Sequence, residues 1–277
     1  MLTMKKFILL LLLFSAAGLS LNIFLEPNRV LRIGVECDYV PNNWVEYVPS
    51  DTNVPIVGED GTYAEGYDIQ IAKLVAQELG AKLEVHKVDW DDLFYALNHG
   101  DIDAIFSGML DTKPRKQFAA FSEPYDAFDN EYTIIVDRNS KYRNAWHIVE
   151  FLGAKIVGQK GTHLDEVIDQ IKGVIHLPPA DSVTESVNMV VEQKADGAVI
   201  NYDTAQPYLR KHKNLRLRRF SEGNGFYLDF TGTCVGVRRN DTDLLEEINR
   251  ALHGISKRDR QRMMDRSIAN ALHHIPQ

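Results

Sequence analysis

The sequence of 277 residues has only two cysteines, Cys37 and Cys234, and no motif of a nucleotide- or metal-binding site. Two cysteines are too few for a disulfide framework, and their spacing does not fit a zinc site. The nine histidines are scattered without the spacing of metal ligands. Positive charge is also in deficit, since the net charge is −8, which argues against a nucleic-acid-binding protein. We therefore expect no metal, no cofactor and no nucleic-acid partner.

Long apolar runs are missing except at the start of the chain, which excludes a membrane protein with many spans. Lys5 and Lys6 precede an unbroken apolar run at 7–14, and small residues follow at 15–18. This order is typical of a secretory signal peptide. The apolar character continues to residue 25, so the segment could instead remain as a membrane anchor. Residues 1–25 are predicted to be one or the other, and both place the rest of the chain outside the cytoplasmic membrane.

The remaining sequence alternates between strand and helix patterns, which predicts an α/β fold with parallel sheets covered by helices on both faces. The alternation forms two series of similar size, and we expect two lobes. A long segment at 38–64, rich in proline and glycine, is predicted to be a loop or a loop with a hairpin. Asp68 is the expected N-cap of a helix that ends at Gly80. Predicted strands lie at 31–35, 82–88, 102–106, 155–159, 174–177, 197–201, 215–220 and 233–238. Predicted helices lie at 68–79, 90–98, 144–151, 163–171, 182–193, 204–210, 243–255 and 257–272, with another opening near Thr112 and Pro114.

Ligands of such proteins bind at the carboxyl ends of the strands, most naturally between the lobes. The residues that follow the predicted strands offer mainly backbone amides, hydroxyls, an amide side chain and aromatic rings. This set suits the binding of a polar small molecule and is poor in groups that make or break bonds. The candidates are Tyr39, Trp44, Ser107, Gly108, Met109, Gly161, Thr162 and Asn201.

Several motifs in this order resemble the solute-binding proteins of ABC amino-acid importers, over about residues 31–256. They lie at 31–35, 66–68, 100–105, 107–109, 114–116 and 121–125 in the first series, and at 153–159 with 161–162 in the second. The resemblance implies two α/β lobes joined by two crossing hinge strands, which close over a small ligand. Lobe 1 would comprise 31–128 and 229–277, lobe 2 would comprise 129–228, and the crossings would lie near 127–132 and 225–231.

The resemblance also implies roles for individual residues. Arg115 would grip the ligand's α-carboxylate, for which a planar guanidinium is well shaped, and a helix N-terminus there would favour the anion. Composition alone would make Arg115 a solvated surface residue. Thr162 would add its hydroxyl and backbone N–H from the other lobe, and it could equally be a helix N-cap.

The remaining candidates would complete the site. Ser107, Gly108 and Met109 would offer backbone groups, with Gly108 allowing close approach. Tyr39 and Trp44 would sandwich the ligand side chain, unless they only pack the long loop.

Two positions depart from the family pattern. Asn201 stands where an acid usually pairs with the ligand's α-ammonium, and Leu110 stands where a hydroxyl is usual. Either Asp203, Asp111 or Asp229 replaces the acid, or the ligand is not a standard α-amino acid.

The predicted function is that of the extracytoplasmic substrate-binding component of an ABC importer, which binds an amino acid or a related small carboxylate by hinge closure. The partners would be this ligand and a membrane permease, and the protein would be a monomer without catalytic residues. Two alternatives stay open: a membrane-anchored ligand sensor, and an enzyme like the cyclohexadienyl dehydratases, which share the fold. The basic run at 210–219 is either a solvated face or a docking surface. The resemblance places one strand between Cys37 and Cys234, so both are expected to be reduced thiols.

Overall fold

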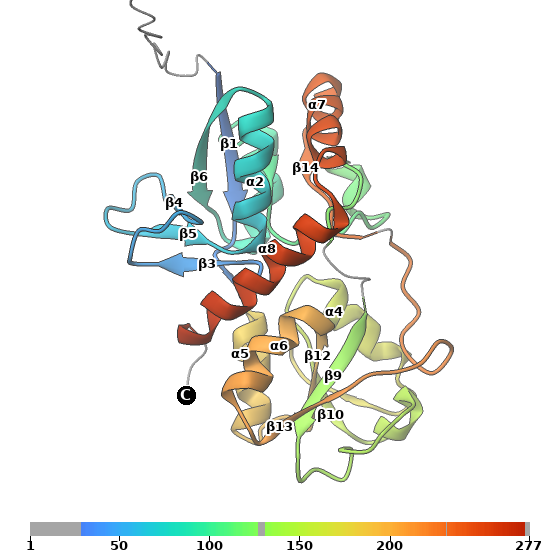
Figure 1. Ribbon diagram of the computed structural model, residues 1–277. Helices are drawn as coiled ribbons and strands as arrows, with labels where there is room; N and C mark the ends of the chain where they lie inside the picture. The colour runs from blue at the N-terminus through green and yellow to red at the C-terminus, as the bar shows by residue number, and fades with distance from the viewer. Residues whose placement is uncertain (1–28, 127–130, 231, 275–277) are drawn as a thin grey trace, which may run out of the picture.

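The computed structural model describes residues 29–126, 131–230 and 232–274, and these form two α/β lobes (Figure 1). The predicted signal or anchor at 1–25 and most of the predicted first crossing lie outside the described residues. Lobe 1 is built on a mixed five-stranded sheet in which β1 runs parallel to its neighbours β6 and β7. The strands, in sheet order, are β6 (Ala81–Lys87), β1 (Arg29–Val35), β7 (Ala104–Ile105), β14 (Gly236–Val237) and β8 (Ala120–Phe121).

Lobe 2 repeats this plan with a second five-stranded sheet. Its central strand β12 pairs in parallel with β10 and antiparallel with β9. The strands, in sheet order, are β11 (Ile175–His176), β10 (Lys155–Val157), β12 (Gly197–Asn201), β9 (Tyr132–Asp137) and β13 (Leu215–Arg218). The predicted two-lobed α/β fold is therefore confirmed, while the residue limits of the lobes stay a prediction.

The helices agree with the predicted order, but three of those predicted in lobe 2, at 144–151, 163–171 and 182–193, are shorter. The predicted helix at 144–151 is only a 3₁₀ turn, η3 (Ile148–Phe151), and the one at 163–171 divides into α4 (His163–Glu166) and η4 (Val167–Gln170). The other α-helices are α2 (Tyr67–Glu78), α3 (Leu93–His99), α5 (Val183–Val191), α6 (Tyr202–Lys211), α7 (Thr242–His253) and α8 (Lys257–Asn270). Three more 3₁₀ turns are η1 (Trp90–Asp92), η2 (Arg115–Gln117) and η5 (Ala271–His273).

The segment at 38–64 carries more structure than a single hairpin. It forms most of a small four-stranded sheet, in which antiparallel pairing connects all four strands. Its strands, in sheet order, are β2 (Asp38–Tyr39), β3 (Asn43–Glu46), β5 (Tyr63–Glu65) and β4 (Val54–Pro55). This sheet extends lobe 1 beside the cleft.

Asp68 is not the N-cap of α2, contrary to the prediction. The cap is Gly66, whose backbone has φ = 129°, a conformation that favours glycine. Asp68 lies in the first turn and is fully buried, where it accepts hydrogen bonds of 2.8 Å from Asn43 Nδ2 and from Tyr125 Oη. This burial raises the pKa of Asp68 to about 7. The carboxyl thus ties the small sheet and the segment before the first crossing to α2.

The C-terminal helix α8 contacts both lobes and runs diagonally between them in Figure 1. On the lobe 1 side, Gln70 Nε2 of α2 donates a 2.8 Å hydrogen bond to Ser267 Oγ. Beyond the helix end, Ala271 is fully buried in the apolar cluster of lobe 2 and η5 packs on α6. His274 returns to lobe 1, where its Nε2 lies 2.6 Å from Glu46 Oε2. The two crossings are therefore not the only link between the lobes.

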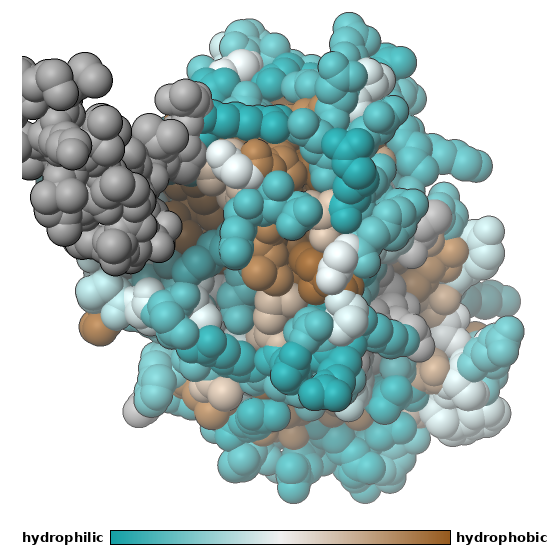
Figure 2. Space-filling view, turned by 45° about the horizontal axis from the view of Figure 1, so that its top comes forward, coloured by the Kyte–Doolittle hydropathy of each residue, from teal (hydrophilic) through white to brown (hydrophobic). Residues whose placement is uncertain are grey.

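The thiols agree with the expectation that was drawn from the family resemblance. Hydrophilic side chains predominate on the face shown in Figure 2. Within the described ranges no helix has the length and apolar character needed to cross a membrane. Cys37 and Cys234 are buried and form no disulfide, and β7 lies between the strands β1 and β14 beside them. In the basic run, Arg219 pairs with Glu131 and lies over the ring of Tyr202, so part of this run is already engaged.

Candidate functional site

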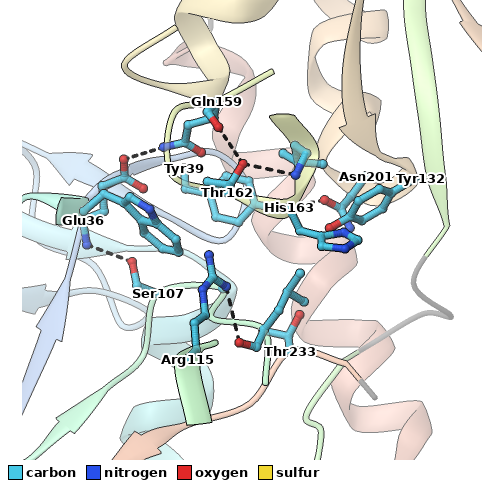
Figure 3. Close-up of a pocket in the computed structure, with 14 residues that line it drawn as sticks. Glu36, Tyr39, Ser107, Arg115, Tyr132, Gln159, Thr162, His163, Asn201 and Thr233 are labelled. Atoms are coloured by element: carbon cyan, nitrogen blue, oxygen red, sulfur yellow. Dashed lines mark hydrogen bonds between the residues drawn. The ribbon is translucent and has the colours of Figure 1, made fainter. Parts of the chain in front are cut away.

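A small pocket lies between the lobes at the carboxyl ends of β1, β7, β10 and β12 (Figure 3). Its cavity volume is about 30 Å³, whereas one ordered water needs roughly 10–15 Å³. The lobes must therefore part to admit a guest of amino-acid size. The described lining residues are Glu36, Tyr39, Trp90, Ser107, Gly108, Leu110, Arg115, Tyr132, Gln159, Thr162, His163, Leu164, Asn201 and Thr233.

Arg115 lines the pocket as predicted, and in Figure 3 its guanidinium is directed toward the middle of the site. It comes from η2, a single 3₁₀ turn, so the expected contribution of a helix N-terminus is wrong. Nη1 donates to Leu110 O at 3.3 Å, and Nη2 donates across the cleft to Gly161 O at 3.2 Å. Burial lowers the pKa of Arg115. Both acceptors are neutral carbonyls, so a carboxylate would be a stronger partner for this group.

Trp90 is a pocket residue that sequence reasoning missed. Its ring lies under Arg115, with the guanidinium carbon 5.0 Å from the ring centroid. Trp90 Nε1 donates a 3.2 Å hydrogen bond to the carbonyl of Gly161, the same oxygen that Arg115 contacts. Gly161 is therefore a closing contact for two lobe 1 side chains, and it does not itself line the pocket.

Trp44, which was predicted to sandwich the ligand, does not line the pocket. It sits on β3 and is 3% exposed, and its ring packs at 5.6 Å from the ring of His274. The reason is the pairing of β3 with β5, which sets Trp44 opposite Glu65 and turns its ring into the core. A tryptophan on η1 takes the position in the cleft that was expected of Trp44.

Thr162 has the predicted N-cap role, and its contact with a ligand carboxylate stays a prediction. It is the N-cap of α4, because its Oγ1 accepts a 3.2 Å hydrogen bond from Leu164 N. The same hydroxyl donates to Gln159 O at 2.7 Å, and the residue is buried in the wall of the pocket.

The three residues after β7 differ in their access to the pocket. Ser107 is fully buried, and its Oγ accepts a 3.0 Å hydrogen bond from Glu36 N. Gly108 has φ = 62°, and a Cβ there would lie 2.5 Å from the ring of Tyr39, so this position needs glycine. Met109 is 1% exposed and is absent from the lining, so its side chain belongs to the core of lobe 1.

Tyr39 and Asn201 face each other across the cleft. Tyr39 Oη donates to Asn201 Oδ1 at 3.3 Å and accepts from Thr204 Oγ1 at 3.3 Å. Burial and the nearby Asp203 raise the pKa of Tyr39, so the phenol stays neutral. Tyr39 lines the pocket, and its contact with a ligand side chain stays a prediction.

Glu36 is the second residue that sequence reasoning missed. It follows β1 directly and lines the pocket, and its Oε1 accepts a 2.8 Å hydrogen bond from Gln159 Nε2 of lobe 2. Burial is the main cause that raises the pKa of Glu36 to about 8, and the nearby charge of Asp38 adds to the rise. Its position directly after the strand was the available signal, since the same rule selected Ser107 and Asn201.

An acidic groove continues from the pocket past Glu36 and Trp90, which line both. Its volume is about 780 Å³, and each lobe contributes carboxylates to it. A 2.7 Å ion pair between Lys160 and Asp91 crosses it from lobe to lobe. The other acidic residues along it are Asp38, Asp89, Asp92, Asp181 and Glu185.

The three proposed replacements for a missing acid lie in different places. Asp111 is buried outside the pocket lining and pairs with Lys116 at 2.7 Å. Asp203 also lies outside the lining, and burial raises its pKa to about 6. Asp229 is the one that reaches a pocket residue, since its Oδ1 lies 3.4 Å from Nε2 of His163.

Two α/β lobes that close on a polar pocket define the class of two-lobed solute-binding proteins. The family model of bacterial extracellular solute-binding proteins, family 3, matches residues 31–267, and the chain belongs to this family. This confirms the predicted function, the extracytoplasmic substrate-binding component of an ABC importer for an amino acid or a related small carboxylate.

Individual relatives agree with this assignment. The arginine-binding extracellular protein ArtP of Bacillus subtilis is 25% identical over 90% of this chain and 92% of its own length. A putative ABC transporter arginine-binding protein of Escherichia coli is 24% identical over 92% of this chain and 94% of its own. Among solved structures, an arginine-bound variant of ArgBP from T. maritima is 28% identical with a TM-score of 0.66, covering 82% of this chain and 96% of that chain.

Proposed function

We propose that the ligand is a basic amino acid, with L-arginine as the first compound to test. Arg115 would bind the α-carboxylate through paired hydrogen bonds, and Thr162 would bind it from lobe 2. Glu36 would receive the cationic side chain, with Tyr39 and Trp90 as aromatic neighbours. Of the described lining residues, Glu36 is the one carboxyl group, and this observation carries the proposal.

The acidic groove supports the same ligand class. Its carboxylates from both lobes give the region beyond Glu36 a negative potential, which favours a cation over a neutral or acidic side chain. The relatives named for arginine binding support it from a separate direction.

A thermal-shift screen of wild-type protein against arginine, lysine, histidine, glutamine and glutamate tests the proposal. A ligand at about 100 times its Kd stabilises a protein by about 2.7 kcal/mol. We expect arginine and lysine to raise the Tm and glutamate to leave it unchanged. Glu36→Gln should reduce the shift with arginine more than the shift with glutamine. A glutamate shift as large as that with arginine would contradict the proposal.

We further propose that the protein binds without catalysis and delivers its ligand to a membrane permease as a monomer. The pocket offers one carboxyl group among its described residues and no nucleophile beside a base, which supports binding over turnover. A membrane-bound lytic murein transglycosylase of Desulfosudis oleivorans matches 44% of this chain and 32% of its own length, so related sequence also occurs within an enzyme. Incubation with cyclohexadienyl acids should leave them unchanged, and any turnover would favour the dehydratase alternative.

Cleavage or retention of residues 1–25 decides whether the receptor is released or stays attached to the membrane. We propose export through residues 1–25, with cleavage or retention as the two forms. Mass spectrometry of the mature N-terminus separates them. A retained segment would favour the anchored sensor or a tethered importer subunit.

A further inference from the structure

His163 is a buried pocket residue with one unused polar atom. Its side chain is 10% exposed and lines the pocket next to Thr162. Its Nδ1 is buried and has no hydrogen-bond partner in the part of the chain that the structure describes. A buried polar atom without a partner costs free energy, so this nitrogen is a candidate for contact with a bound guest.

The ring of His163 is held in place by residues near the two crossings. Tyr132 and Phe230 contact it edge to face, with ring centroids 5.7 and 5.1 Å away. Its Nε2 lies 3.4 Å from Oδ1 of Asp229, whose side chain is 45% exposed. Nε2 therefore faces the outer side, and Nδ1 faces the buried side, where Figure 3 shows the ring beside Asn201 and Tyr132.

Asp229 determines which nitrogen of His163 can bind a guest. A carboxylate beside one ring nitrogen holds the proton there and leaves the other nitrogen as a hydrogen-bond acceptor. The other charged or titratable groups near this ring are the Arg115 cation and the Tyr132 phenol, with Glu166 close to both. Nδ1 is then a buried acceptor on a residue that lines the pocket.

We propose that the His163–Asp229 pair binds the α-ammonium of the ligand, with Nδ1 of His163 accepting its hydrogen bond and Asp229 supplying the negative charge behind the ring. The inference rests on the proposed function only in requiring an α-amino acid. Asn201 lines the same pocket as a neutral residue, and its Oδ1 accepts a 3.3 Å hydrogen bond from the Tyr39 hydroxyl. The pair replaces a carboxylate in direct contact with the α-ammonium.

The experiment compares two ligands that differ only in the α-amino group, L-arginine and 5-guanidinopentanoate, by isothermal titration calorimetry. His163→Ala should weaken arginine about 10- to 100-fold and change the affinity for 5-guanidinopentanoate less than about threefold. Asp229→Asn, at a half-exposed position, should act in the same direction if the first variant folds poorly. His253→Ala is the control, because this exposed histidine pairs with Glu123 outside the pocket.

Equal losses for both ligands in either variant would overturn the inference, as would an unchanged arginine affinity. If wild-type protein binds neither compound, the proposal of a basic side chain is wrong. This result differs from a failure of the His163–Asp229 inference, in which wild-type protein still binds arginine. The α-ammonium test then uses glutamine with its des-amino analogue and the same three variants, with the same outcomes deciding.

Discussion

Glu36 of lobe 1 accepts a hydrogen bond from Gln159 of lobe 2. Nε2 of Gln159 donates to Oε1 of Glu36 at 2.8 Å. The contact lies in the wall of the pocket, so whatever binds there must meet this carboxyl. The group is buried, and its pKa is raised to about 8 because the charged form lacks water. At neutral pH the carboxyl of the unliganded protein is therefore mainly protonated.

Binding of arginine should release a proton from Glu36. The pKa of this carboxyl is raised in the unliganded structure, so its stabilising contribution is present at low pH and is lost as the pH rises toward about 8. A ligand cation favours the carboxylate, so arginine affinity should increase with pH below about 8. Calorimetry in buffers of different ionisation enthalpy measures the proton. Glu36→Gln should abolish the release, and a buffer-independent enthalpy in wild type would contradict the prediction.

Arg115→Ala should weaken arginine binding by at least about 100-fold. Two charge-assisted hydrogen bonds to the α-carboxylate are lost, and each contributes about 1.5–3 kcal/mol. The matched control is Arg143→Ala, at an exposed arginine whose Nη1 contacts Ser140 O outside the pocket. Fluorescence or calorimetric titration gives both affinities. Retention of wild-type affinity in Arg115→Ala would refute the carboxylate assignment.

Gly66→Ala should lower the free energy of unfolding by at least about 1–3 kcal/mol. The residue has a positive φ, and the added Cβ would lie 2.3 Å from the carbonyl oxygen of Asn42. Gly61→Ala is the control, because Gly61 also has a positive φ but nothing lies within 4 Å of an added Cβ. Urea unfolding compares the two variants. Equal losses would show that the close approach at Asn42 is relieved by movement of the loop.

Both thiols should be present and unreactive in the native protein. Burial raises the pKa of the Cys37 thiol to about 12, so little thiolate exists at pH 8. A thiol reagent such as DTNB should label neither cysteine rapidly in native protein and both in denaturant. Fewer than two labelled thiols in denatured, unreduced protein would indicate a disulfide and contradict the structure.

Much of the site could be predicted because strand ends are visible in the sequence. Thr162 and Tyr39 follow predicted strands, Arg115 was assigned from the family resemblance, and all three line the pocket. Glu36 follows a strand in the same way, yet its role depends on Gln159, which is 123 positions away and approaches only when the lobes meet. No local sequence pattern indicates that Glu36 and Gln159 come into contact.

The tryptophans illustrate the other limit. Trp44 and Trp90 both lie near predicted strand ends, and only strand pairing decides which of them faces the cleft. β3 pairs with β5 and turns Trp44 inward, whereas η1 presents Trp90 to Arg115. In lobe 2, the apolar spacing at 144–151 is compatible with a helix, but the segment closes as a single 3₁₀ turn.

The tail that ends in α8 and η5 affects how this protein can be handled. Because Ala271 is anchored in one lobe and His274 pairs with Glu46 of the other, a fusion attached at this end would pull on both bodies at once. Dyes or purification tags placed there would alter the opening equilibrium that they are meant to report. The exposed turn at 138–141 does not line the pocket and is the better attachment point.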